Sequence, residues 1–269
     1  CRRAAAPYLR HDLHLRLPEP ADQGDMGPCP GGDPARRRHA GDVRSQLRQD
    51  HRRIGQTVDD NTWLAYPAGA PSTTSYTADK LNRYSAVTGM TPSYDANGNM
   101  TGDGTYTYGY DAENRMVSAN GGGNNSTYAY DGRGWRKIRT VNGTTTISVT
   151  DSDNRKVLEY DGGTGAILRW YAYGLGPNEA LNQMNVPASA RAAFAPDLQG
   201  SIVATFNSAG ILSKAAYLAY GGSVAAATPF GYTGQRLDGE SGGLYYYRAR
   251  HYSHLLGRFV QADPLGYSV

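Results

Sequence analysis

Residues 105–110 and 126–130 place tyrosines at alternate positions, with small or polar residues between them. A period of two is typical of a β-strand, whose successive side chains point to opposite faces. Each stretch is followed by Asp and then by Asn or Gly, residues that bond the local backbone or tolerate positive φ. The pattern therefore predicts units of strand, turn and strand. Because a single hairpin is only marginally stable in water, we expect these units to pair side by side in one extended antiparallel sheet.

A Tyr-Asp pair opens each unit. Such pairs start at Tyr94, Tyr110 and Tyr130, and a weaker copy starts at Tyr76. The steps between these tyrosines are 18, 16 and 20 residues, which is too irregular for a helical solenoid and suits hairpins with turns of different length. Further strands are predicted at residues 144–150, 156–160, 166–173, 201–206 and 211–217.

Residues 177–195 are ambiguous between helix and strand. Glu179–Met184 and Ser189–Phe194 can each form a helical turn, whereas Pro187 prevents one continuous helix.

Residues 229–269 form a third segment with the densest mixture of aromatic residues, arginine and glycine in the chain. Its pattern predicts a strand, a Gly-rich turn, a strand around Tyr245–Tyr247, a second turn and a short strand that ends before Asp263-Pro264. We therefore divide the chain into an N-terminal segment (1–57), a sheet of Tyr-Asp hairpins (58–228) and this C-terminal segment (229–269).

The N-terminal segment lacks a sustained apolar period and differs in charge from the rest. Residues 1–58 contain 11 Arg and 7 Asp or Glu, whereas the remainder contains 16 Lys or Arg and 17 Asp or Glu. The pI of about 8.8 therefore originates in the first fifth of the chain, and we expect no nucleic-acid binding by the remainder. Three interpretations stay open for residues 1–57: a basic arm, a disordered segment, or translation of a GC-rich gene in the wrong frame.

The overall composition excludes several kinds of site. The chain has 34 Gly, 21 Tyr and only 4 Phe, so we expect a core built from rings whose hydroxyl groups need partners. No apolar run is long enough to span a membrane, and no apolar signal-peptide stretch opens the chain. Cys1 and Cys29 are not spaced as zinc ligands, and His251 and His254 lack a third ligand nearby, so no cofactor or metal is expected.

The Tyr-Asp units resemble the YD repeats of the RHS (rearrangement hotspot) proteins. Residues 197–201, followed by 207–210, are similar to that family's Asp-x-Leu-Gly-Ser segment. Residues 229–266 resemble the RHS repeat-associated core through Tyr-Thr-Gly-Gln, Gly-Leu-Tyr-Tyr-Tyr-Arg-Ala-Arg, Leu-Gly-Arg-Phe and Asp-Pro-Leu-Gly. The resemblance covers roughly residues 58–267 and leaves residues 1–57 outside it.

This resemblance implies an all-β fold in which an extended antiparallel sheet of YD-repeat hairpins curls as part of a hollow RHS-type β-shell, preceded by a disordered N-terminus. The core segment would turn inward and plug one end. The implied partners are the rest of the shell and a C-terminal toxin domain, in a bacterial polymorphic toxin that is secreted or associated with the cell surface.

The resemblance also implies a partial aspartic self-cleavage site. It places the family's arginine at Arg250 and its first catalytic aspartate at Asp263, while the second aspartate would lie beyond Val269. Aspartic chemistry needs two carboxylates that share a proton, so we expect this chain not to cut itself. The simpler interpretation makes Asp263-Pro264 a turn, and gives Arg248, Arg250 and Arg258 salt bridges and tyrosine stacking.

Two alternative functions stay open. A flat sheet with exposed aromatic rings would favour a module that binds cell-surface glycans, and the orientation of Trp135 and Trp170 distinguishes this hypothesis from a shell. A nonfunctional gene remnant is the other alternative.

Overall fold

The computed structural model describes residues 43–47, 53–58, 73–223 and 228–264. The chain divides into two compact units, Cys1–Trp63 and Leu64–Val269. In the first unit, β1 (Val43–Leu47) pairs antiparallel with β2 (Arg53–Val58), a hairpin that the sequence analysis did not predict. The rest of the segment 1–57, including both cysteines, lies outside the described residues.

The second unit contains a strip of thirteen antiparallel strands. Their order in the sheet is their order in the sequence, so each strand is joined to its neighbour by a turn, as sequential hairpins require. The strands are β5 (Ser93–Tyr94), β6 (Met100–Gly102), β7 (Tyr106–Tyr110), β8 (Met116–Gly121), β9 (Asn124–Tyr130), β10 (Arg136–Val141), β11 (Thr144–Thr150), β12 (Lys156–Asp161), β13 (Ile167–Tyr173), β14 (Ala180–Asn185), β15 (Ala190–Pro196), β16 (Ile202–Asn207) and β17 (Leu212–Lys214).

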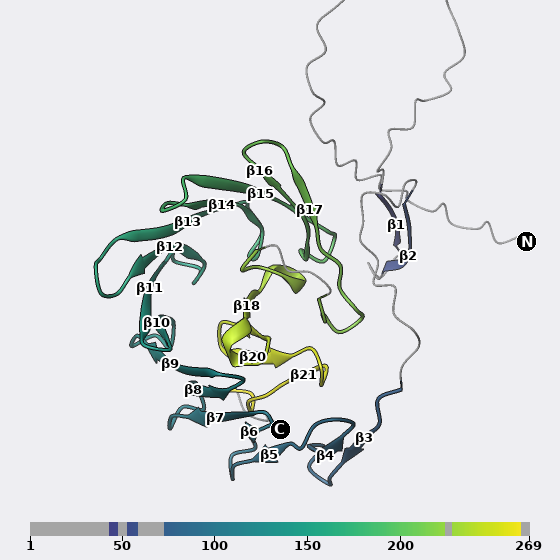
Figure 1. Ribbon diagram of the computed structural model, residues 1–269. Coiled ribbons are helices and arrows are strands. Elements are labelled where there is room, and N and C mark those ends of the chain that lie inside the picture. Colours follow the sequence, from purple (N-terminus) through teal and green to yellow (C-terminus); the bar gives the residue numbers. More distant parts are fainter. Residues whose placement is uncertain (1–42, 48–52, 59–72, 224–227, 265–269) are drawn as a thin grey trace, which may run out of the picture. The chain divides into compact units, whose positions relative to one another are not determined.

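A second sheet, formed by the C-terminal segment, lies against the strip. It contains β18 (Arg236–Asp238), β19 (Leu244–Tyr247), β20 (Arg250–Ser253) and β21 (Arg258–Phe259), with the short 3-10 turns η2 (Tyr232–Gly234) and η3 (Gly239–Ser241) around β18. Figure 1 shows the strip curving around these strands. A small hairpin of β3 (Tyr76–Ala78) and β4 (Tyr84–Val87) precedes the strip.

Backbone hydrogen bonds join the C-terminal segment to both halves of the strip. The N–H of Met100 in β6 donates to the carbonyl of Val260 (2.8 Å), and the N–H of Ile202 in β16 donates to the carbonyl of Gly231 (3.1 Å). The segment is thus bound to strands that are ten positions apart in the sheet order.

One type of turn recurs after the Tyr-Asp pairs and at other hairpins. Asp111 Oδ1 accepts hydrogen bonds from the backbone N–H groups of Glu113 (3.0 Å) and Arg115 (2.9 Å). Asn114 between them has a φ of 59°, in the left-handed region that Asn and Gly adopt most easily. The predicted turn chemistry is confirmed. The same bonds, to residues two and four positions further on, are made by Asp79, Asp131, Asp151, Asp197 and Asn207.

The side chains of the units are linked as well. Arg115 bonds Asp111 (2.7 Å) and lies over the ring of Tyr130, with 5.1 Å between its guanidinium carbon and the ring centroid. The Tyr130 hydroxyl donates to the carbonyl of Met116 (2.7 Å). This contact supplies the partner that a partly buried tyrosine hydroxyl needs. Arg83 over Tyr94 and Arg155 over Tyr173 repeat the stacking.

The interior contains two apolar clusters. The first lies where β6–β9 meet the C-terminal segment, and the second lies where β13–β16 meet Phe230. The first includes Val87, Met100, Tyr108, Met116, Ala119, Tyr128, Leu244, Leu256 and Val260, and the second includes Tyr171, Ala180, Phe194, Ile202 and Phe230.

The helical alternative for residues 177–195 is wrong. Residues Ala180–Asn185 and Ala190–Pro196 are the strands β14 and β15, and Pro187 lies in the turn between them. These strands have hydrogen-bonded neighbours on both sides, so ladder bonds and burial of Ala180 and Phe194 override the local helical preference. Strand β17 is also shorter than predicted, because it ends at Lys214.

Among the residues that the structure describes, no helix is long and apolar enough to cross a membrane.

Substitution of Gly134 tests the turn. Gly134 has a φ of 76°, and an added Cβ would meet its nearest atom, Arg115 Nη1, at an ordinary 3.8 Å. Gly134→Ala should therefore lower the free energy of unfolding by about 1–2 kcal/mol through backbone strain alone. Gly132→Ala in the same turn is the matched control, because Gly132 lacks positive φ and has open space around it. Equal effects in urea unfolding would contradict this account.

Candidate functional site

The structure brings the two predicted site residues together. Arg250 opens β20, and its Nη1 lies 2.8 Å from Oδ2 of Asp263, which follows β21. The guanidinium of Arg250 also stacks on the ring of Phe259, with 3.9 Å to the centroid. Arg250 and Asp263 remain 24% and 45% exposed, so this pair lies at the surface of the C-terminal sheet. Exposed pairs of this kind contribute little to stability.

The neighbouring arginines have structural contacts. Arg248 Nη2 donates to the carbonyl of Pro177 (2.6 Å) and to Asn178 Oδ1 (2.7 Å). Arg258 lies over the ring of Tyr84 at 3.8 Å and bonds Asn82. Arg258 therefore has the aromatic stacking that the simpler interpretation predicts, whereas Arg248 bonds neutral oxygens.

A second cluster is buried between the strip and the C-terminal segment. Arg136 at the start of β10 forms a two-pronged ion pair with Asp238 at the end of β18: Nη1 to Oδ2 is 2.5 Å and Nη2 to Oδ1 is 3.0 Å. Their side chains are 1% and 0% exposed. The guanidinium of Arg136 lies between the rings of Tyr246 (3.8 Å) and Tyr128 (4.9 Å). One face of each ring thus covers the charge.

His251 completes this cluster. Its Nε2 lies 3.6 Å from Asp238 Oδ2 and 3.4 Å from Arg136 Nη1. Burial lowers the pKa of His251, and the nearby Arg136 adds to this effect, so the imidazole is neutral near pH 7. Burial alone would raise the pKa of Asp238, but Arg136 and His251 hold it well below its usual value. The carboxylate is therefore ionised and paired.

A second buried carboxylate lies beside the first. Glu159 Oε1 in β12 is 2.6 Å from Arg236 Nη1 in β18, and its Oε2 accepts from the Tyr171 hydroxyl (2.9 Å). Burial pushes the pKa of Glu159 upward, yet Arg236, Lys156 and the Tyr171 bond outweigh it and lower the pKa to about 2. Strands β12 and β18 are thus joined by an ion pair as well as by packing.

This buried cluster connects the strip to the C-terminal segment. The ring nitrogens of His251 contact Arg136 and Gln261, and within the described residues no group of three or more His, Cys, Asp and Glu side chains is placed to hold a metal ion. His254 instead contacts the carbonyl of Gly243 (3.2 Å) and the ring of Tyr245.

Sequence reasoning missed Arg136 and Asp238. In the sequence, Arg136 simply follows Trp135 and Asp238 simply precedes Gly239, and neither stands in a pattern that marks a site. Their separation of 102 positions leaves no local pattern that pairs them. The only available signal is the presence of charged residues at strand positions that face inward.

Trp135 and Trp170 do not form an exposed aromatic strip. Trp135 is half-buried between Arg133 and Lys137, which lie 5.2 and 5.3 Å from its ring. Trp170 is half-buried too, and its register partners in the strip are the aliphatic Leu158 and Met184. This arrangement lends no support to glycan stacking.

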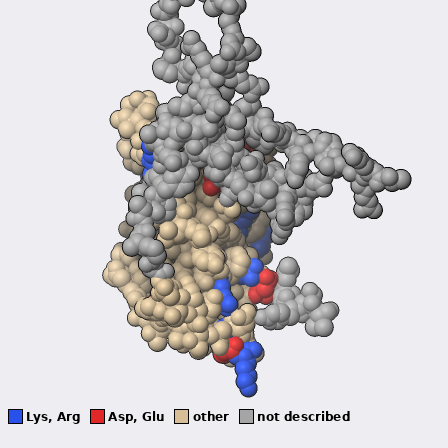
Figure 2. Space-filling view, turned by 90° about the vertical axis from the view of Figure 1, so that its right-hand side faces the viewer, with Lys and Arg blue, Asp and Glu red and all other residues tan. Residues whose placement is uncertain are grey.

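One face of the described residues carries few charged side chains. On the face drawn in Figure 2, most of the described residues are uncharged, and the Lys or Arg groups lie among Asp or Glu groups.

Comparison with known proteins places this geometry in context. No family model matches the chain. The tRNA3(Ser)-specific nuclease WapA of Bacillus spizizenii is 30% identical over 208 residues, which cover 73% of this chain and 9% of that protein. The tRNA nuclease WapA of Bacillus subtilis strain 168 is 30% identical over 207 residues, with the same coverage. The chain thus spans about a tenth of the length of these relatives.

Among solved structures, the fold is similar to that of TcdB2-TccC3, with a TM-score of 0.53 at 16% identity, over 84% of this chain and 16% of that one. The Photorhabdus luminescens Tc holotoxin pore gives a TM-score of 0.52 at 16% identity, with the same coverage. The predicted fold class, an all-β antiparallel sheet of the RHS shell type, is confirmed. At this level of identity the likeness concerns the fold.

Removing one partner of the buried ion pair tests how much the Arg136–Asp238 contact contributes to stability. Arg136→Met leaves the buried Asp238 charged, with only the longer ion-pair contact to Arg236 (3.7 Å), so we expect a loss of about 3–5 kcal/mol in the free energy of unfolding. The control is Arg83→Met, whose ion pair with Asp79 is about a third exposed and should matter by less than about 1 kcal/mol. Urea unfolding measures both. Similar losses in the two variants would contradict a special role for Arg136.

The pH dependence of stability tests His251. Its pKa is lower in the folded state than the 6.5 of an exposed histidine, so the folded state binds fewer protons than the unfolded state. Stability is therefore fully present above pH 6.5 and falls as the pH drops below it, by at most about 1.4 kcal/mol per pH unit for each such histidine. Arg136, Asp238 and Glu240 act electrostatically on the ring, and Arg136 and Asp238 stay charged in this range.

The measurement is urea unfolding at pH 7.5, 6.5 and 5.5. His251→Gln should flatten the slope below pH 6.5. Burial also lowers the pKa of His254, so His254→Gln should remove a separate part of the slope. An unchanged slope in His251→Gln would show that this histidine does not carry the effect.

Proposed function

We propose that this chain is part of an RHS-type toxin protein, in which the strip forms shell wall and the C-terminal segment plugs the shell beside a C-terminal toxin. The observation that carries the proposal is the buried Arg136–Asp238 pair, which binds the segment to the inward face of the strip. A protein whose only role was to present an outer surface would not need an ion pair buried at its centre, because removing both charges from water is costly.

The comparisons support the toxin context. The relatives at 30% identity are named tRNA nucleases, and one of the similar solved structures is TcdB2-TccC3 without its hypervariable C-terminal region. Toxic activity in this scheme belongs to a variable segment, and the 30% identity covers only 9% of each relative's length. We therefore assign to this chain the role of scaffold, in a protein that is secreted or displayed on the cell surface.

Arg250 and Asp263 are proposed as one half of an aspartic self-cleavage site. Asp263 would supply one carboxylate, and Arg250, at 2.8 Å, would hold that carboxylate in position. Activation of water and protonation of the leaving amine require a second carboxylate that shares a proton with the first. We propose that this second group comes from polypeptide that follows Val269.

Protease protection tests the shell proposal. In a polypeptide that continues into a toxin domain, the domain should resist a nonspecific protease while the shell is closed. Asp238→Asn leaves Arg136 without its carboxylate and should expose the domain to cleavage at lower protease concentrations. Asp153→Asn is the control, because the Asp153 side chain is 62% exposed and its contact with Arg155 is a longer one, at 3.4 Å. Equal protection in wild type and Asp238→Asn would contradict the proposed plug.

Intact-mass spectrometry tests the cleavage proposal. The purified 269-residue chain should keep its full mass during incubation, because only one of the two carboxylates is present. A defined internal cut that disappears in Asp263→Asn would contradict this expectation.

A further inference from the structure

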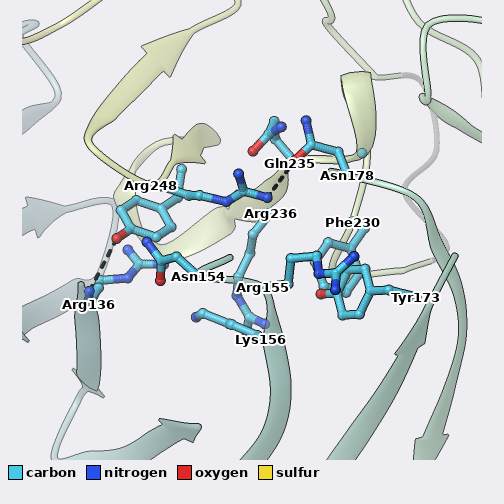
Figure 3. A pocket seen from close by; sticks show the side chains of 12 residues that line it. Arg136, Asn154, Arg155, Lys156, Tyr173, Asn178, Phe230, Gln235, Arg236 and Arg248 are labelled. Atoms are coloured by element: carbon cyan, nitrogen blue, oxygen red, sulfur yellow. Dashed lines mark hydrogen bonds between the residues drawn. The ribbon is translucent and has the colours of Figure 1, made fainter. Parts of the chain in front are cut away.

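A cavity of about 40 Å³ opens between the inward face of the strip and the C-terminal segment. Figure 3 shows the side chains that surround it. The described residues of its lining include five cationic side chains and no Asp or Glu. The five are Arg136, Arg155, Lys156, Arg236 and Arg248.

Three of these cations are paired with acids that are not themselves part of the lining. Arg136 pairs with Asp238, Arg236 pairs with Glu159, and Arg155 pairs with Asp151 and Asp153.

The other two cations have no carboxylate partner in the described part of the chain. Arg248 donates only to the neutral oxygens of Pro177 and Asn178. Lys156 makes no hydrogen bond or ion pair with described residues, and its Nζ lies 6.0 Å from the centroid of the Tyr246 ring. The surplus positive charge of the cavity therefore lies on Lys156 and Arg248.

Lys156 is an unusual residue to bury in this way. Its side chain is only 8% exposed, and an ammonium group that is removed from water without a partner is strongly destabilised. Burial, helped by Arg236 and Arg136, holds the pKa of Lys156 well below its usual value, although Glu159 and Asp238 act in the opposite direction. A lysine in such a place either stays neutral or takes an anion as its partner.

Further donors beside Lys156 lack acceptors. The Nε groups of Arg136 and Arg236 are buried and make no hydrogen bond, although both arginines have carboxylates nearby. Buried donors are rarely left without a partner. Both arginines belong to the lining of the same cavity as Lys156, so a group with acceptor oxygens would meet several cationic side chains there.

We propose that this cavity binds one compact oxyanion, a carboxylate or a sulfate-like tetrahedral group, with Lys156 and Arg248 as its charge partners. The size of the cavity agrees with this assignment: 40 Å³ is a few times the roughly 10–15 Å³ that one water needs, which admits a single acidic group and excludes a nucleotide. The anion has two sources, a free ion or the acidic side chain of a polypeptide. This inference does not depend on the proposed toxin context.

Isothermal titration calorimetry at pH 7 tests the proposal, with sodium sulfate and sodium acetate as separate probes. Sodium chloride keeps the ionic strength constant, so that general screening does not contribute to the signal. We expect saturable binding of at least one probe with a stoichiometry near one. Tighter binding of sulfate assigns the site to a free tetrahedral anion, and tighter binding of acetate assigns it to a side-chain carboxylate.

Lys156→Met keeps most of the side-chain volume and removes the charge, so it should weaken binding at least tenfold. It should fold normally, because it removes an unpaired buried amine. Lys137→Met is the matched control: Lys137 bonds Thr150 outside the cavity, and its loss should leave the affinity unchanged.

Arg248→Gln is a second test at a half-buried position and should also weaken binding about tenfold. The proposal is overturned if neither probe binds wild type saturably, or if wild type and Lys156→Met bind with equal affinity.

Discussion

The Arg136–Asp238 ion pair is the constraint on which the arrangement of the two sheets depends. It joins the first residue of β10 to the last residue of β18 across the middle of the molecule, with both side chains removed from water. The desolvation of two charges is offset only when their geometry is good, and here the contact is two-pronged and lies against the ring of Tyr246. The contact therefore specifies one position of the C-terminal segment better than apolar packing would.

The charged middle separates two apolar clusters. One lies around Met100 and Leu244, and the other lies around Tyr171 and Phe230. Between them the strip presents Arg136, and also Lys156 and Glu159, to its interior, where a common sandwich would place aliphatic residues. The oxyanion cavity lies in this same polar zone.

Much of the strip was predictable because its determinants are local. The alternating tyrosines predicted the strands, and the Asp residues of the Tyr-Asp units predicted turns that occur with positive φ at Asn114 and Gly134. The helical alternative at residues 177–195 was wrong, because sheet neighbours on both sides decide the structure there. For the site, Arg250 and Asp263 were found from their motif, and the structure places them in contact. Neither Arg136 nor Lys156 carried a motif.

The sequence by itself thus determined the all-β class, the order of the hairpins and the turn chemistry, since these depend on residues a few positions apart. Only the tertiary structure decided that Asp238 meets Arg136, 102 positions earlier, and that Lys156 is buried without a carboxylate partner among the described residues. Each of these outcomes depends on how far the strip curves before the C-terminal segment docks. Curvature sums small twists over thirteen strands, and no single stretch of sequence encodes it.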